Sequence, residues 1–176
     1  MTDSYQVQGL LVLHAAPAPG AAGAPRPARP PLLLVHGSGH GAWCWEQWLE
    51  RLPALGWEAY ALSVRNHPGS RAVPREEFLR HTRLEHYVDD VAAVAAHIGR
   101  PCAVVGHSMG GLIAQRFAAR QLAAGGALPA LVLLAPAPPG QLGPLRDAPL
   151  PTDVPYALER AVAAQRYFPT TPPDVL

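Results

Sequence analysis

Cysteine is scarce in this sequence, which has only Cys44 and Cys102 among its 176 residues. The two are far apart and form no metal-binding or redox spacing, so a site built on cysteine is not expected. Cys102 begins an apolar run, where a small core side chain is the expected role. We therefore expect a reduced, cytoplasmic protein.

Long hydrophobic runs and an excess of one charge are missing as well. No apolar run approaches the roughly 20 residues that a membrane-spanning helix needs. The first residues lack the basic and apolar segments of a signal peptide. The 14 basic and 13 acidic side chains leave a formal net charge of +1. Neither a membrane nor nucleic acid is therefore an expected partner.

What the sequence does contain is a regular alternation of strand and helix patterns. Apolar runs predict strands near residues 32–36, 58–63, 102–106 and 131–135, and the runs at 32–36 and 102–106 predict buried ones. Apolar side chains at helical spacing predict helices near residues 43–55, 83–98 and 109–123. This repetition predicts an α/β fold: a three-layer sandwich in which a mostly parallel sheet has helices on both faces. Residues 5–14 are expected to add one or two antiparallel edge strands.

The helix near residues 83–98 carries local start and stop signals. Thr82-Arg-Leu-Glu85 has the pattern of a capping box, in which a threonine and an acid three residues later satisfy free amide groups. Gly99 follows the last apolar position of the stripe and is expected to end the helix.

Proline-rich segments suggest how the chain is divided. Residues 1–135 are expected to form the core, with a stiff connector at 15–31 that includes "PAPGAAGAPRPARPP". Residues 136–176 are expected to begin a cap region. That region has a helical pattern at 156–168 and a second helix-start signal at Thr171-Pro-Pro-Asp174.

A serine turn follows the apolar run at 102–106. Gly106-His-Ser-Met-Gly110 matches G-x-S-x-G, with Gly111 next. A serine held at a strained turn needs small residues two positions before and after it, because larger ones would collide. Between a buried strand and a helix, this pattern predicts that Ser108 is a nucleophile. The alternative is an ordinary glycine-rich strand–helix loop.

Two backbone amides are candidates to stabilise an oxyanion at this serine. The N–H of Met109 lies at the start of the helix near 109–123, where free amides and the positive end of the helix dipole favour negative charge. The second candidate is the N–H of Ser38, in the loop after the first buried strand. Glycines 37, 39 and 41 let that loop approach a ligand closely.

The same loop permits other interpretations. Residues 37–42 also satisfy G-x-G-x-x-A, a dinucleotide-binding pattern, but the next strand does not end in the acidic residue that a ribose requires. His36, His40 and His67 could meet at this end of the sheet, yet no carboxylate joins them to form a metal site. We expect His36 to brace the loop by hydrogen bonds and His40 to line the pocket.

Three tryptophans follow the glycine loop. Trp45 and Trp48 fall on the apolar stripe of the predicted helix and are expected in the core. Trp43 stands beside the loop and is assigned equally to the core or to the pocket wall.

The segments "LLLVHGSGHGAWCWEQW" and "VVGHSMGG" resemble the α/β-hydrolases, specifically the esterases, plant methylesterases and hydroxynitrile lyases. The likeness spans roughly residues 30–140. It implies that Ser108 is the nucleophile, that the amides of Ser38 and Met109 form the oxyanion hole, and that no cofactor is used. Hydroxynitrile lyases usually carry threonine where Gly37 stands, which favours hydrolysis. The expected supporting residues are His36, Gly37, Gly106, His107, Gly110 and Gly111, and the expected pocket residues are Gly39, His40 and Trp43.

In the family that the sequence resembles, a catalytic acid and a histidine follow the serine. All eight histidines here lie at or before His107. The acids after the serine turn follow no apolar strand; they are Asp147, Asp153, Glu159 and Asp174. We therefore expect that the catalytic histidine and acid are absent, and that the chain is the N-terminal part of a hydrolase.

Two hypotheses of different classes follow. In the first, the protein is a serine hydrolase of a small ester or related acyl substrate. In the second, it is a non-catalytic remnant that binds a small molecule or a partner on the same fold. A weaker variant lets His40 replace the missing histidine. The apolar strand at 131–135 is a possible edge for self-association, because no second apolar run follows it.

Overall fold

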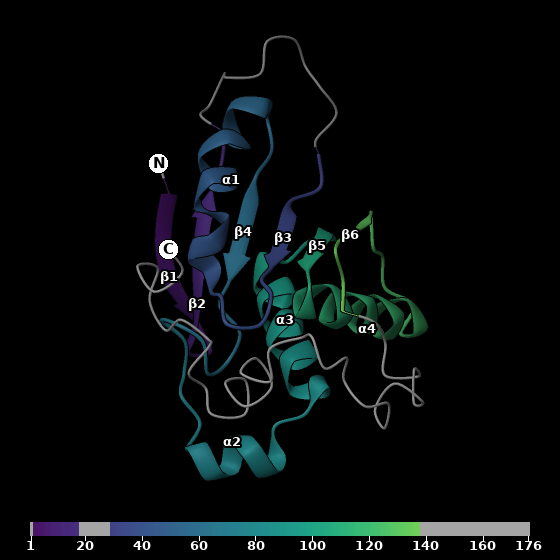
Figure 1. The fold of residues 1–176 in the computed structure, drawn as a ribbon. Coiled ribbons are helices and arrows are strands. Elements are labelled where there is room, and N and C mark those ends of the chain that lie inside the picture. The colour runs from purple at the N-terminus through teal and green to yellow at the C-terminus, as the bar shows by residue number, and fades with distance from the viewer. Residues whose placement is uncertain (1, 18–28, 138–176) are drawn as a thin grey trace, which may run out of the picture.

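The computed structural model describes residues 2–17 and 29–137 and contains one six-stranded sheet in the order β1-β2-β4-β3-β5-β6 (Figure 1). The strands are β1 (Thr2–Val7), β2 (Leu10–Ala15), β3 (Leu32–Val35), β4 (Ala59–Leu62), β5 (Ala103–His107) and β6 (Leu131–Leu134). β1 and β2 form an antiparallel hairpin, and β2 pairs antiparallel with β4. The pairs β3–β4, β3–β5 and β5–β6 are parallel, so the predicted mostly parallel sheet with an antiparallel edge is confirmed.

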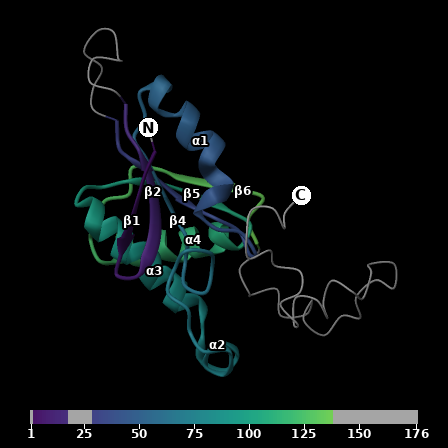
Figure 2. The same cartoon turned by 90° about the vertical axis from the view of Figure 1, so that its left-hand side faces the viewer.

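Helices cover both faces of this sheet (Figures 1 and 2). The helices are η1 (Ala42–Trp45), α1 (Glu46–Arg51), η2 (Pro53–Leu55), α2 (Arg75–His81), α3 (Leu84–Ile98) and α4 (Met109–Ala123). Of these, α2 lies away from the sheet (Figure 1). α3 and α4 pack on one face, where Val91 and Ile113 join the buried side chains of the strands. η1 and α1 pack on the other face through Trp45 and Leu49. β3 lies between these two cores, and all four of its residues are buried.

The region predicted as one helix at 43–55 is divided into η1, α1 and η2. Pro53 begins the last of these short helices, since its ring cannot continue the hydrogen bonding of α1. Trp45 is buried as predicted, but the prediction for Trp48 was wrong: its side chain is 38% exposed. Its ring meets that of Trp45 edge-on, 5.1 Å between centroids, at the rim of the core.

The capping box predicted at Thr82 is also wrong. α3 begins after Arg83, whose N–H donates to Nδ1 of His86 at 3.1 Å. Thr82 instead ends α2, a helix that the sequence analysis missed, and its N–H donates to the carbonyl of Phe78. The signals for α2 were present, because Pro74 precedes it and acids occupy its first turn.

The predictions for the cap region from residue 138 onward, including the helical pattern at 156–168, lie outside the described residues. Across the two described segments, no helix is both long enough and apolar enough to cross a membrane.

Candidate active site

Ser108 lies at the junction of β5 and α4, with a φ of 52° and a ψ of −118°. Few residues other than glycine adopt a positive φ, and such strain persists only where surrounding structure enforces it. Here the Ser108 N–H donates to the Leu134 carbonyl at 3.0 Å. The Ser108 carbonyl accepts from the N–H of Gly111 at 3.0 Å and of Ala137 at 2.8 Å. The turn is therefore held by its own helix and by the end of β6.

The glycines around Ser108 lie where side chains do not fit. A Cβ on Gly106 would collide with the carbonyl of Gly110, and a Cβ on Gly110 would collide with the carbonyls of Val35 and His36. A Cβ on Gly111 would lie 2.6 Å from the Cβ of Pro136. The small residues thus allow three close contacts: β5 with α4, α4 with the end of β3, and α4 with the segment after β6.

The loop after β3 lies directly against Ser108. A Cβ on Gly37 would be 3.1 Å from the Ser108 Cβ and 2.9 Å from Nδ1 of His107. The loop then turns at Gly39, which has a φ of +76°, and the His40 N–H donates to the Gly37 carbonyl at 3.3 Å. This contact packs the start of the Ser38 loop against the turn that leads into Met109.

The amides of Ser38 and Met109 are the two predicted donors to an oxyanion. Among the described residues, neither N–H donates to an acceptor of the protein. Met109 begins α4, which has no acidic side chain in its first turn to neutralise the positive end of its dipole. Two free amides and a helix N-terminus beside a serine are what stabilisation of an oxyanion requires.

His36 holds the base of this loop and is fully buried. Its Nδ1 is 2.7 Å from the Gly37 carbonyl, and its Nε2 accepts the Val64 N–H at 3.1 Å. These two partners require the neutral tautomer with the proton on Nδ1, because Nε2 must keep a lone pair for the amide. Burial, reinforced by the nearby His67, lowers the pKa of His36 to about 3.

Three further histidines surround the loop without contacting the Ser108 hydroxyl. The His67 ring lies 4.7 Å from that of His36, and burial lowers its pKa. Nδ1 of His40 is 3.1 Å from the Ser38 carbonyl, and its ring is 6.0 Å from that of His107. Within the described part of the chain, no histidine nitrogen is hydrogen-bonded to Ser108 Oγ, and no three potential ligands are grouped to hold a metal ion.

The side of the loop away from Ser108 is built around Ser63, at the end of β4. Its Oγ accepts the N–H of Ala42 at 2.8 Å, which fixes the start of η1. A Cβ on Gly41 would lie 3.0 Å from Ser63 Oγ and 2.9 Å from the Trp43 ring. Trp43 is half-buried and lies 5.6 Å from the ring of His40, so the structure places both predicted pocket residues together.

Sequence reasoning missed an ion cluster beside this site. Asp90 of α3 is buried and binds Arg65 and Arg71, both from the loop after β4. An acid on a helix usually faces solvent, so the sequence offered little sign that Asp90 is buried. The one indication was its place on the otherwise apolar side of α3, near Val91 and Val94.

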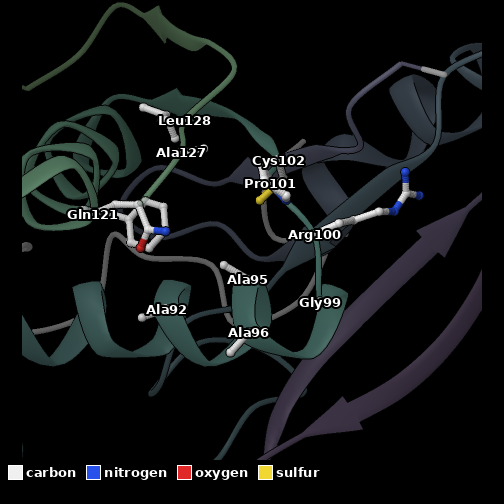
Figure 3. Close-up of a pocket in the computed structure, with 11 residues that line it drawn as sticks. Ala92, Ala95, Ala96, Gly99, Arg100, Pro101, Cys102, Gln121, Ala127 and Leu128 are labelled. Carbon is white, nitrogen blue, oxygen red and sulfur yellow. The ribbon is translucent and has the colours of Figure 1, made fainter. Parts of the chain in front are cut away.

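A hollow of about 330 Å³ lies at the other end of the sheet, between the C-terminal halves of α3 and α4 (Figure 3). Ala92, Ala95, Cys102, Gln121 and Leu128 are among its lining residues. It lies at the start of β5, whereas Ser108 follows the end of that strand. We therefore do not assign the chemistry of Ser108 to this hollow.

The model of the family described as "Alpha/beta hydrolase family" matches residues 32–176. The chain is 38% identical over 80 residues to "Esterase PIR7B" of Oryza sativa subsp. japonica, covering 46% of this chain and 30% of that protein. It is 32% identical over 94 residues to "Protein phosphatase methylesterase 1" of Rattus norvegicus, covering 53% of this chain and 24% of that protein.

Among solved structures, an epoxide hydrolase from an endophytic Streptomyces matches with a TM-score of 0.57 at 25% identity. The match covers 76% of this chain and 36% of that one. The chain therefore spans about a third or less of each of these three relatives.

Proposed function

This chain belongs to the alpha/beta hydrolase family, and we propose that it carries the nucleophile and oxyanion hole of a serine esterase. One observation carries the proposal. Ser108 sits at a positive φ between β5 and α4, with Gly37 packed on its Cβ. We infer that the amides of Ser38 and Met109, the residues that follow Gly37 and Ser108, flank the hydroxyl. This arrangement suits attack on a carbonyl better than it suits any other chemistry of a serine.

In the proposed reaction, Ser108 Oγ attacks the carbonyl carbon of the ester while its proton passes to a histidine. The carbonyl oxygen becomes an oxyanion and accepts the N–H groups of Ser38 and Met109, next to the positive end of α4. The tetrahedral intermediate then collapses, the histidine returns its proton to the oxygen of the leaving alcohol, and an acyl-serine remains for water to hydrolyse. His36 keeps the Ser38 loop in place but is tied to Gly37 and Val64 and is not the base.

The base and its acid come, we propose, from residues outside this chain. The sequence has no histidine after Ser108, and in the described part no histidine is bonded to the serine hydroxyl. Nδ1 of His40 lies 3.1 Å from the Ser38 carbonyl, and among the described residues no bond joins His40 to Ser108 Oγ.

A small ester or related acyl compound is the proposed substrate. Two curated relatives are named an esterase and a methylesterase, and no part of the proposed mechanism needs a cofactor. Trp43 and His40 would form one wall of the acyl pocket. The segment after Pro136 would set specificity as a cap.

A non-catalytic role is the second candidate. It is favoured by the same lack of a histidine after Ser108. In that role the protein would keep the pocket around Ser108 and bind an ester-like molecule without cleaving it.

Labelling with a fluorophosphonate, with and without added imidazole, tests the first candidate. Loss of a triad member can cost on the order of 10⁶ in turnover, so the chain alone should label only at background. Imidazole in solution can replace the missing base, and labelling should then rise at Ser108. The matched control is Ser108→Ala, in which imidazole should have no effect.

Two results would count against this proposal. Labelling that is insensitive both to imidazole and to Ser108→Ala would support the non-catalytic role. Rapid labelling without imidazole, lost in Ser108→Ala, would show that a histidine within residues 1–107 acts as the base.

A further inference from the structure

Asp90 takes part in more hydrogen bonds than any other side chain in the described part of the molecule. It lies on α3, with its side chain fully buried. Three groups of Arg65 donate to it: the main-chain N–H at 2.9 Å, Nε at 2.9 Å and Nη2 at 2.7 Å. A fourth donor is Nη2 of Arg71 at 3.0 Å. A buried carboxylate with this many donors is strongly held, and removing it leaves the mostly buried Arg65 and the more exposed Arg71 without this partner.

Through these bonds Asp90 closes the loop between β4 and α2. Arg65 and Arg71 stand at the two ends of a short turn, where the Asn66 N–H donates to the Arg71 carbonyl at 3.0 Å. Within the turn, Ser70 Oγ donates to the Ser63 carbonyl at 2.6 Å. The carboxylate binds both arginines, so it fixes the turn at both ends.

The turn between Arg65 and Arg71 also holds His67 against His36. Nδ1 of His67 lies 2.9 Å from the Arg65 carbonyl, so the position of Arg65 orients the imidazole. The His67 ring packs on that of His36, and the Val64 N–H, next to Arg65, donates to Nε2 of His36. His36 then reaches the Gly37 carbonyl, and Gly37 packs on Ser108.

We propose that Asp90 is a positioning residue for the oxyanion loop, acting through Arg65 and the pair His67 and His36. The inference rests on the proposed function for its catalytic meaning, but its structural content is independent of activity. It predicts that weakening the bonds of Asp90 loosens His36 and Gly37 more than it loosens the core. A purely structural ion cluster would instead lower the stability of the whole domain evenly.

Hydrogen exchange in the full chain separates these two cases. With ¹⁵N-labelled histidine, NMR follows the Nδ1 proton of His36, which is bonded to the Gly37 carbonyl. The main-chain N–H of Val104 in β5, bonded to the Ala130 carbonyl just before β6, reports on opening of the sheet. The readout is the exchange rate of His36 divided by that of Val104.

Two variants weaken the cluster to different degrees. Asp90→Asn removes the negative charge, and Arg71→Gln removes only the donor whose side chain is 43% exposed, which leaves the Arg65 pair intact. We expect the ratio to rise about tenfold in Arg71→Gln and further in Asp90→Asn. If Asp90→Asn does not fold, Arg71→Gln alone decides.

The chain offers two matched controls. Asp89→Asn makes the same change one residue earlier, in an exposed pair with Arg120. Val94→Ala weakens the core one turn along α3, away from the ion cluster. Both should leave the ratio within about twofold of its normal value, even where Val94→Ala speeds both exchange rates.

An unchanged ratio in Arg71→Gln, or a ratio that Asp89→Asn raises as much as Asp90→Asn, would overturn the proposal. Neither result depends on ester cleavage. If Ser108 proves unreactive, the proposed function fails while the exchange ratio still decides whether Asp90 positions the loop.

Discussion

At the scale of single residues, the site depends on glycines that carry no side chain and on a histidine that carries no proton on Nε2. Gly37 and Gly110 let three pieces of main chain meet around Ser108 at distances that a methyl group would block. Nε2 of His36 must stay unprotonated, because it accepts the Val64 N–H. Each of these features makes a prediction about stability.

Replacing Gly110 by alanine should destabilise the protein strongly. The new Cβ would meet the main-chain carbonyls of Val35 and His36, which cannot move without shifting β3. We expect a loss of about 3 kcal/mol or more in the free energy of unfolding, measured by urea melts. Gly125→Ala is the matched control. It has open space around it and a φ of +75°, so only about 1 kcal/mol of backbone strain is expected. Equal losses in the two variants would contradict this account.

Acid should destabilise the fold through His36. Its pKa in the folded protein is about 3, below the ordinary value of 6.5, so the unfolded chain binds a proton first as the pH falls. The stabilisation from neutral His36 is complete above about pH 6.5 and is lost as the pH falls toward 3. Between pH 7 and pH 4 we expect a loss of about 3 kcal/mol. The lowered pKa of His67 acts in the same direction.

Urea melts across this pH range, compared with those of His36→Gln, measure the effect. The variant should be less stable at pH 7 but should show a smaller fall between pH 7 and pH 4. An equal slope in both proteins would assign the acid sensitivity to other groups.

At the scale of elements, the site is a junction between α4 and the loop after β3. In the proposed oxyanion hole, α4 supplies the Met109 amide and its dipole, and the loop supplies the Ser38 amide. The proposal therefore needs both elements. Asp90 on α3 extends the junction to a third element, because it fixes the turn after β4 that holds His67 and His36.

Ser38→Pro tests the contribution of the loop. Proline has no N–H, so one of the two donors to the oxyanion is lost. In the imidazole-assisted labelling described above, the rate should fall roughly 10²–10³-fold. Ser38→Ala keeps the amide and should label at the normal rate. A normal rate in Ser38→Pro would place the second donor elsewhere.

At the scale of the whole molecule, β6 is an edge strand of the described sheet. Among the described strands it pairs with β5 alone, and Val132 and Leu133 are 42% and 37% exposed. Strands with free main-chain groups and apolar side chains template pairing with other chains. The chain spans about a third or less of its relatives, and we expect it to be marginally stable or to self-associate through residues 131–135.

Sedimentation velocity at increasing protein concentration measures that association. Val132→Lys should reduce it, because a charge on an edge strand opposes pairing. Glu46→Lys, on an exposed position of α1 remote from β6, controls for the added charge. A monodisperse monomer at every concentration, with a steep cooperative urea transition, would contradict the expectation.

The sequence by itself determined the features that depend on local pattern. Apolar runs predicted the four parallel strands, β3 to β6, and the layered α/β fold. For β3 and β5 the run is continuous because both faces are buried. The spacing of glycines about Ser108 pointed to a tight turn, because the collision that requires it lies within five residues. The tertiary structure alone decided which distant groups meet. It made Thr82 the end of α2, left Trp48 at the rim, and buried Asp90 between Arg65 and Arg71. A solvent-facing acid and a buried one look alike along the chain, and only the packing of α3 against the turn after β4 distinguishes them.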